Sequence, residues 1–215
     1  GGTLQLANDT GLSFNRNTTV TTTSTITSDR LTSGAGVTHT LGTLSIGTQT
    51  LNITAGTNVT SGTAGVTFGA TTLSGNPTFD VGTGAQLTLG ALAGGGAART
   101  IAKADTGTLI FGAAAGVLTT GSSLVVNDGI AQVNTAGALG ATGLFNVVVN
   151  STTASGTAAF NLNNVSQTIG TLTFGGAGAG ASAVNSVATG TGTLTLGNVT
   201  YDATNNPGGA TLSGK

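Results

Sequence analysis

The acidic side chains of this sequence are the first place to look for chemistry, and all of them are aspartates. They are Asp9, Asp29, Asp80, Asp105, Asp128 and Asp202. General acid and base catalysis needs two such groups within a few ångströms of one another. Three of them are separated by 25 and 23 residues, a spacing that would bring them near one corner of a repetitive fold. Aspartates among glycine and asparagine mostly form turns, however, and we expect no catalytic residue.

The basic side chains and the one histidine add little to this set. His39 has no second histidine, cysteine or nearby acid beside it, so we expect it in a surface turn rather than in a metal site or a catalytic triad. Arg99 and Lys103 lie on one strand edge, and Lys103 is two residues before Asp105. We predict that Lys103 pairs with Asp105 at the surface, where such a pair contributes little to stability.

Motifs for bound ligands are lacking as well. Calcium-binding solenoids need a glycine-rich nonapeptide of the form G-G-x-G-x-D, and the glycine-rich runs at 94–96 and 175–180 have no such aspartate. Both runs also lack the lysine and the helix start of a phosphate-binding loop. The chain has no cysteine, which excludes disulfides and thiolate metal sites. We therefore expect no metal and no cofactor, and we do not expect an enzyme.

The composition is that of a strand-forming chain with very little charge. Of 215 residues, 38 are glycine and about a fifth are threonine, whereas only 5% are charged and the formal net charge is -1. Abundant β-branched residues favour strands over helices. Five lysines and arginines cannot supply the phosphate contacts of nucleic-acid binding, and no apolar run reaches the ~18 residues of a membrane span. We expect neither a nucleic-acid partner nor membrane insertion of this segment.

One strand pattern recurs along the chain at a nearly fixed interval. Its clearest copy, GTLTLG at 192–197, places two leucines on one side of a strand and two threonines on the other. Similar copies end on glycines 47, 69, 90, 112, 175 and 197, at intervals of 22, 21, 22, 63 (three times 21) and 22. A fixed interval of this size is typical of a solenoid. We predict an all-β fold, a parallel β-helix of about ten turns of 20–22 residues, as one segment over 1–215.

This geometry predicts which residues face the interior. The last apolar residue of each copy is expected on one internal column, formed by Ile46, Phe68, Leu89, Phe111, Phe174 and Leu196. Within the long gap, the strand Gly129–Val133 is expected to continue the stack after the copy at 107–112, and further strands are expected at 145–149 and 159–162. An antiparallel sandwich would show the same alternation of apolar and polar residues, but the constant interval favours the solenoid.

Four runs resemble the autotransporter-associated β-strand repeat. They are GTLQL at 2–6, VNDGIAQVNTAGALGATG at 126–143, SQTIGTLTFGG at 166–176 and TGTGTLTLGNVTYDATNN at 189–206. In that family a glycine-flanked strand with alternating leucines is followed by turns of threonine, asparagine and glycine. The resemblance implies a long, secreted bacterial surface protein with a right-handed β-helical passenger.

A flat array of threonine hydroxyl groups would indicate another function, ice binding. Five alternate threonines would face one side of a strand over 19–27, as in β-helical ice-binding proteins: Thr19, Thr21, Thr23, Thr25 and Thr27. Such an array must recur on the same face of every turn, and the other copies interrupt it with Ser45 and Ile110. Ice binding is therefore a weaker alternative, as is a carbohydrate-active β-helix enzyme, which would need clustered carboxylates.

The function we expect is structural. A stiff β-helical rod would serve as a spacer on the bacterial cell surface or outside the cell, and its sparse charge would permit assembly into filaments. The sequence opens and closes within a repeat, so we expect it to continue in a longer chain, and we expect copies of itself as partners, end to end or side by side. The alternative is the adhesin passenger of an autotransporter, a rod that presents a glycan- or host-binding tip.

Overall fold

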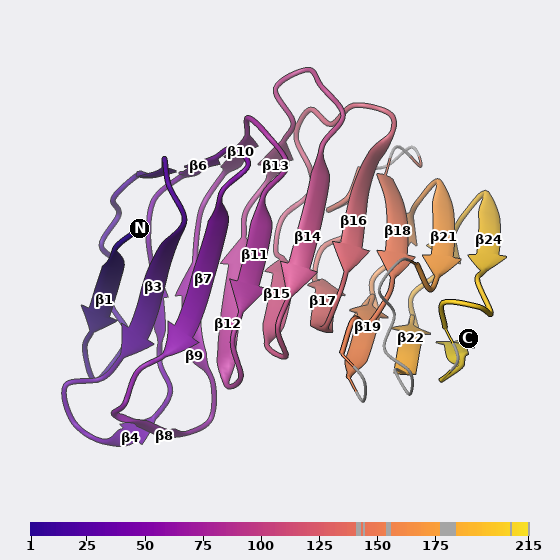
Figure 1. The fold of residues 1–215 in the computed structure, drawn as a ribbon. Helices are drawn as coiled ribbons and strands as arrows, with labels where there is room; N and C mark the ends of the chain where they lie inside the picture. The colour runs from indigo at the N-terminus through magenta and orange to yellow at the C-terminus, as the bar shows by residue number, and fades with distance from the viewer. Residues whose placement is uncertain (141–142, 144, 154–155, 177–183, 207, 215) are drawn as a thin grey trace.

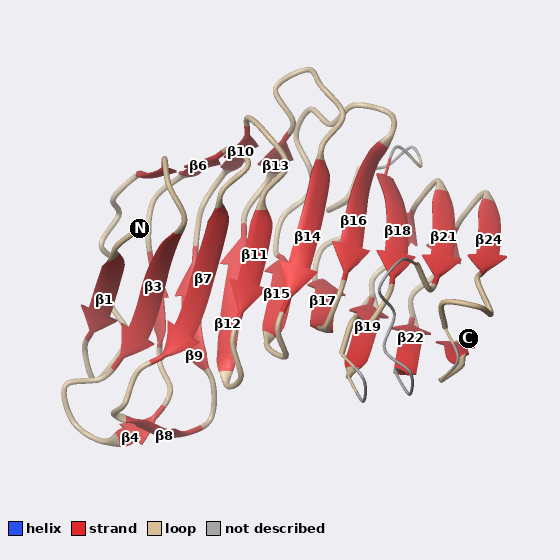
Figure 2. Cartoon of the chain, in the orientation of Figure 1, coloured by secondary structure: helices blue, strands red, loops and turns tan. Residues whose placement is uncertain are grey.

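The computed structural model describes residues 1–140, 143, 145–153, 156–176, 184–206 and 208–214. Every regular element in these residues is a β-strand (Figure 2). The strands wind into a coil whose two termini lie at opposite ends of the molecule (Figure 1). In the described part of the chain there is accordingly no helix with the length and hydropathy to cross a membrane.

Three parallel sheets run along the coil. The first sheet is formed, in spatial order, by β1 (Thr3–Ala7), β3 (Ser24–Asp29), β7 (Thr50–Ala55), β11 (Thr78–Val81), β14 (Thr100–Ala104), β16 (Ser122–Val126), β18 (Phe145–Val149), β21 (Thr171–Phe174) and β24 (Asn198–Tyr201). The second sheet is formed by β5 (Thr38–Thr40), β9 (Ala64–Thr67), β12 (Ala85–Leu89), β15 (Thr108–Phe111), β17 (Gly129–Val133), β19 (Thr157–Asn161), β22 (Val184–Ala188) and β25 (Ala210–Ser213).

The third sheet covers the amino-terminal half and is shorter. It contains β2 (Thr18–Val20), β6 (Leu44–Ile46), β10 (Thr71–Leu73) and β13 (Leu92–Ala93), and the pair β20 (Gln167–Thr168) and β23 (Leu194–Thr195) forms a separate ladder nearer the carboxyl end. A further pair, β4 (Gly34–Ala35) and β8 (Val59–Ser61), lies outside the three sheets, at the edge of the coil (Figure 1). All of these pairings are parallel, so the expected parallel β-solenoid is confirmed.

The number and length of the turns differ from the sequence prediction. Partners in the first sheet are 22 residues apart between Thr3 and Thr25 and 28 apart between Thr50 and Thr78. The nine strands of this sheet make about eight turns rather than ten. At ~4.8 Å per turn, the coil is about 40 Å long. The predicted turn length of 20–22 residues was too short. The corners between sheets vary in length, and a single fixed interval cannot represent that variation.

The predicted internal column is correct only in part. Phe111 stacks between Leu89 and Val133 in the second sheet, and Phe68 follows β9 in the same sheet. Ile46 instead belongs to the third sheet, between Val20 and Leu73. Phe174 belongs to the first, between Val149 and Tyr201, and Leu196 follows β23. The repeated strand pattern therefore occurs in different sheets, and its copies do not form one column.

Alternation within each strand builds the interior. In β12 and β16, for example, every second residue is buried and the residues between them are partly exposed. Six phenylalanines lie inside: Phe68, Phe79, Phe111, Phe145, Phe160 and Phe174. The strand predicted at Gly129–Val133 does stack on the 107–112 copy, through the pair Phe111 and Val133. Strands also form at Phe145–Val149, as expected, and at Thr157–Asn161, which begins and ends earlier than the strand expected at 159–162.

Candidate functional site

Most of the buried polar side chains gather where each turn passes from the first sheet to the second. Along this corner, from the amino to the carboxyl end, they are Ser28, Asp29, His39, Lys103, Asp128, Asn150, Ser151, Asn185 and Asn206. We refer to these nine residues as the polar seam. Because a buried polar group is costly unless it is hydrogen-bonded, the seam is the part of the molecule where chemistry has to be sought.

The aspartates whose spacing indicated a common corner lie around the middle of the seam, and Asp128 is the one that belongs to it. Asp80 pairs in register with Ala104, so Asp105 follows one position after that pair. The next turn continues the alignment, since the amide of Asn127 donates to the carbonyl oxygen of Lys103 at 2.9 Å. The structure therefore places Asp80, Asp105 and Asp128 on three successive turns of one corner, as their intervals suggested.

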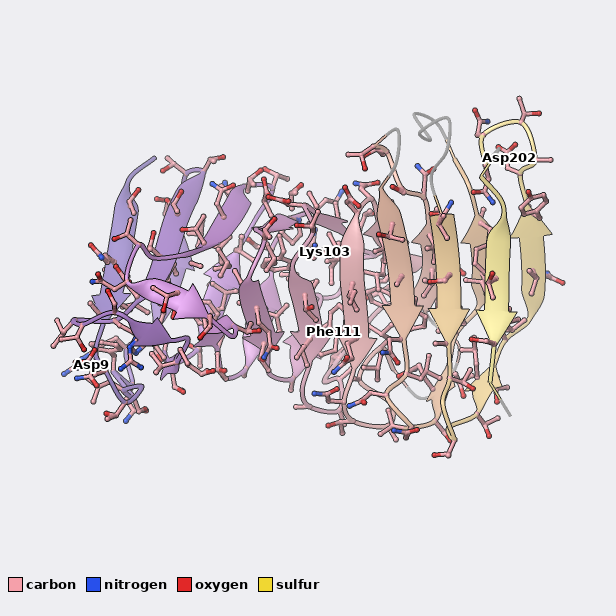
Figure 3. All side chains as sticks on the ribbon, turned by 90° about the horizontal axis from the view of Figure 1, so that it is seen from below. Asp9, Lys103, Phe111 and Asp202 are labelled. Carbon is pink, nitrogen blue, oxygen red and sulfur yellow. The ribbon has the colours of Figure 1, made fainter. Side chains whose placement is uncertain are left out.

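Lys103 lies inside the coil rather than on its surface. It occupies an inward position of β14, between Phe79 of the turn before and Val126 of the turn after, and its side chain is fully buried. Figure 3 labels it in the middle part of the coil, whereas Asp9 and Asp202 lie toward opposite ends. The surface ion pair with Asp105 was a wrong prediction, because the ammonium group binds main-chain oxygens instead.

Three carbonyl oxygens surround the buried ammonium group. Nζ of Lys103 donates to the carbonyl oxygens of Ala104 (2.7 Å), Asp105 (2.5 Å) and Asp128 (3.2 Å). An ammonium group has three hydrogens to donate, so all of its hydrogen-bonding capacity is used. Two of the acceptors belong to its own turn and one to the next, and Lys103 thereby ties two turns together at the corner.

The electrostatics of this corner follow from burial. Burial lowers the pKa of Lys103 to about 8, and the carboxylates of Asp105, Asp128 and Asp80 oppose that shift. Burial also raises the pKa of Asp80, and the negative charge of Asp105 adds to the effect while Lys103 counteracts it. Shifted pKa values are found at catalytic sites and also in structural ion networks.

The geometry favours the structural explanation here. Asp128 is itself engaged, since its carboxylate accepts from the amide of Gly129 (3.1 Å) and from the hydroxyl of Thr153 (2.9 Å). A surface hollow of about 270 Å³ beside the corner is lined by uncharged residues, namely Thr106, Gly129, Ile130, Thr157 and Ala159. The Asp128 carboxylate and the Lys103 amine therefore stabilise the corner through these hydrogen bonds.

In the amino-terminal part of the seam the buried charged group is a carboxylate that accepts hydrogen bonds, whereas Lys103 donates them. The Asp29 carboxylate accepts hydrogen bonds from the amides of Arg30 (2.8 Å) and Asn58 (3.0 Å) and from the Gln5 side chain (2.6 Å). Asn58 lies in the following turn and Gln5 in the preceding one, so this carboxylate links three turns. Sequence reasoning treated Asp29 only as a turn residue and missed this role.

His39 was also placed wrongly by the sequence, which indicated a surface turn. Its ring is fully buried. Nδ1 accepts from the amide of Leu12 at 3.2 Å, so the proton resides on Nε2, which donates to the carbonyl oxygen of Asp29 at 3.0 Å. The ring therefore joins Leu12 of the preceding turn to Asp29 of its own turn, and the inward position of residue 39 in β5 was the signal that could have indicated this.

The outermost aspartates accept backbone hydrogen bonds, Asp9 from the following turn of the coil and Asp202 from the residues just after it. Asp9 accepts from the amides of Leu31 and Thr32 and from the Thr32 hydroxyl, and these hydrogen bonds lower its pKa. Asp202 accepts from the amides of Thr204 and Asn205 and from the Asn205 side chain, which lowers its pKa as well.

Neither a metal cluster nor a continuous hydroxyl array is found where the chain is described. No three histidine, cysteine or acidic side chains come together there in a way that would hold a metal ion. The five alternate threonines do not share one face, because Thr19 is in the third sheet whereas Thr25 and Thr27 are in the first. Of the glycine-rich run at 175–180, residues 177–180 lie outside the described residues.

Comparisons with protein-family models, with curated proteins and with solved structures give no match to this chain.

Proposed function

We propose that this chain is a stiff structural rod, a β-helical spacer of a bacterial cell-surface or extracellular protein, which lengthens by adding turns at its ends. Parallel hydrogen-bonded sheets along the axis support a mechanical role, as does the polar seam, whose contacts join neighbouring turns. The resemblance of four sequence runs to the autotransporter-associated repeat supports the location outside the cell.

The single observation that carries the proposal concerns the two end faces of the coil. Leu4 of β1 continues the buried column of Ile26 and Ile53, yet it is 48% exposed. At the other end, Val199 continues the column of Leu172 and is 51% exposed. Each end thus presents interior side chains together with an unpaired strand edge, the arrangement on which another parallel strand can stack.

The second sheet ends in the same way. Leu212 of β25 continues the column of Val187 and Phe160 and is 52% exposed. Because all strands within a sheet run in one direction, the carboxyl face of one copy and the amino face of a second copy have matching strand polarity. Such a contact is heterologous and does not close on itself, so it produces linear filaments. We propose this head-to-tail contact between copies as the assembly mode of the isolated chain.

An experiment with blocked ends tests this assembly mode. Leu4→Lys places a charge on the amino face and Val199→Lys places one on the carboxyl face, so each variant retains one functional face. Analytical ultracentrifugation should show concentration-dependent chains for the unmodified protein, monomers for each variant alone, and dimers when the two variants are mixed. Thr67→Lys, on the outer face of β9, is the matched control and should assemble normally. A protein that stays monomeric at every concentration would contradict head-to-tail assembly.

The adhesin passenger is the second candidate, and one feature favours it. The β4–β8 pair extends beyond the three sheets (Figure 1), and Leu31 in the loop that leads to it is 65% exposed. An exposed extension of this kind is where a rod would present a ligand-binding surface. Binding of glycans or host-surface proteins that is lost in Leu31→Asp, while rod assembly is retained, would favour the adhesin over the spacer.

A further inference from the structure

The three sides of the coil do not end at the same level on the carboxyl face. The third side carries the third sheet and the β20–β23 ladder, because β20 and β23, like β6, β10 and β13, each lie between a second-sheet strand and a first-sheet strand in chain order. β23 precedes β24, so the first and second sheets, which end with β24 and β25, extend one strand further than the third side. Among the described residues β23 has one neighbouring strand, β20, and the carboxyl face therefore has a step along its third side.

The step leaves one edge of β23 open. On the paired edge, the amide of Gln167 in the preceding turn donates to the carbonyl oxygen of Thr193 at 3.0 Å. The amide of Ile169 donates to the carbonyl oxygen of Thr195 at 2.8 Å. Successive residues of a strand direct their main-chain groups to opposite sides, so the N–H and C=O groups of Leu194 point to the open edge. A further parallel strand would find a donor and an acceptor there.

The side chains beside this edge belong to the interior of the coil. Leu194 pairs in register with Gln167, which is 2% exposed, yet Leu194 itself is only partly buried against the core. A hollow of about 230 Å³ lies beside it, formed by Leu194, Leu196 and Leu212 with threonine, serine and glycine around them. The residues that line this hollow are all uncharged, so it suits an apolar and uncharged occupant.

A second copy in the proposed head-to-tail contact does not fill this position. Its β1 would stack on β24, and its residues around Ser13, which bridges to Thr40 of β5, would stack on β25. Its β2 belongs to the same turn as its β1, whereas β23 lies in the turn before β24. Two strand spacings, about 10 Å, would therefore separate β23 from the β2 of the second copy, and exactly one strand fits between them.

We propose that the open edge of β23 is an acceptor site for one extended peptide segment that has two apolar residues separated by a residue with a hydroxyl group. The pattern is that of the third-side strands themselves, in which Leu44 and Ile46 are buried on either side of Ser45. The segment would run parallel to β23, because every pairing on this side is parallel. Its role in completing the junction rests on the proposed head-to-tail contact, whereas its binding to a single chain does not.

A titration with two synthetic peptides, followed by the methyl NMR signals of the chain, tests the acceptor edge. The probe is GTLSIG, the sequence of residues 42–47. The control is GTSLIG, which has the same composition but adjacent apolar residues, so that only one of them can face inward. The titration uses Val199→Lys, in which the carboxyl face is blocked for a second copy. GTLSIG should shift the signals of Leu194, Leu196 and Leu212 in a saturable way, and GTSLIG should not.

Two substitutions in β23 test the position of the peptide. Leu194→Lys places a charge beside the hollow and should weaken the binding of GTLSIG about tenfold or more. Thr195→Lys is the matched control, because this side chain is exposed on the outside of the same strand, and it should bind GTLSIG as the parent does.

Sedimentation of the unmodified chain separates this site from the head-to-tail contact. GTLSIG should increase the fraction of end-to-end chains, because it fills the remaining strand position at the junction, and GTSLIG should leave that fraction unchanged. A chain that binds GTLSIG but stays monomeric would refute the head-to-tail contact and support the acceptor edge on its own. The acceptor edge is overturned if the three leucine signals do not shift, if both peptides bind equally, or if Leu194→Lys binds GTLSIG as well as Thr195→Lys does.

Discussion

Two corners of the same rod solve the problem of buried backbone groups in opposite ways. Between β14 and β15 the chain turns in only three residues, 105–107, and a lysine inside the corner donates to three carbonyl oxygens. Between β3 and β5 the passage takes eight residues, 30–37, and an aspartate accepts from two backbone amides. The short corner leaves carbonyl groups unpaired inside, whereas the long corner leaves amide groups.

The sign of the buried charge therefore follows the polarity of the backbone groups that a corner leaves without partners. A cation compensates carbonyl oxygens and an anion compensates N–H groups, and these hydrogen bonds offset part of the cost of burying each charge. Asp29 and Lys103 thus have structural roles that mutation can test, independently of the proposed assembly.

The largest effect is expected at the long corner. Asp29→Ala leaves the amides of Arg30 and Asn58 without their acceptor and should lower the free energy of unfolding by about 3–5 kcal/mol. Asp29→Asn keeps one acceptor oxygen at the same place and should cost only about 1 kcal/mol. Urea denaturation of both variants provides the measurement. Equal losses would show that the amide contacts do not matter and that the long corner is held by other groups.

At the short corner the expected signature is a dependence on pH. The folded chain releases the Lys103 proton near pH 8, whereas the unfolded chain holds it up to a pKa of 10.5. Between these values the unfolded state binds more protons, so stability should rise with pH, by on the order of 3 kcal/mol in total. Urea denaturation at pH 7 and pH 10 tests this, with Lys103→Met as the variant in which the increase should disappear. A stability that falls over this range, or an increase that persists in Lys103→Met, would refute the assignment.

The tightness of the short corner gives a third, smaller effect. A Cβ atom at Gly107 would collide with the carbonyl oxygens of Val81, Gly82 and Ala85 in the preceding turn. We expect Gly107→Ala to cost about 1–3 kcal/mol through this overpacking. At Gly82 the nearest atom to an added Cβ is the carbonyl oxygen of Ile53 at 3.3 Å, so Gly82→Ala is the matched variant with a smaller loss. Thermal unfolding of the two proteins should rank them in this order, and the reverse order would contradict the close approach.

The smallest effect is expected on the outside of the same corner. The hydroxyl groups of Thr83 and Thr106 lie 2.6 Å apart on adjacent turns and are exposed to solvent. Thr83→Ala should change the free energy of unfolding by no more than about 0.5 kcal/mol, as is usual for surface substitutions. A loss comparable to that of Asp29→Ala would mean that outer contacts, rather than the polar seam, hold the turns together.

Much of the fold followed from the sequence because strand alternation is a local property. The strands at Gly129–Val133 and Phe145–Val149 were identified by it, since inward and outward residues alternate whatever the length of the corners. The turn count was wrong because GTLSIG, GTLIFG and GTLTFG lie in the third, second and first sheets respectively. Spacing between copies in different sheets does not measure a turn.

Around the polar seam, the sequence predicted only the corner that the spacing of the aspartates determines. The intervals between Asp80, Asp105 and Asp128 indicated a shared corner, and the structure places them there. The interior positions of Lys103 and His39 could not be read from composition, because whether a polar side chain is tolerated inside depends on backbone groups from neighbouring turns. Those groups become known only once the length of each corner is known.

Electron microscopy of the isolated chain tests the central claim of a rod with extendable ends most directly. Particle lengths should fall at about 40 Å and at multiples of that length, at the width of a single coil, with the fraction of longer particles rising with concentration. Particles of a single length at all concentrations, or clusters that widen without lengthening, would contradict end-to-end extension.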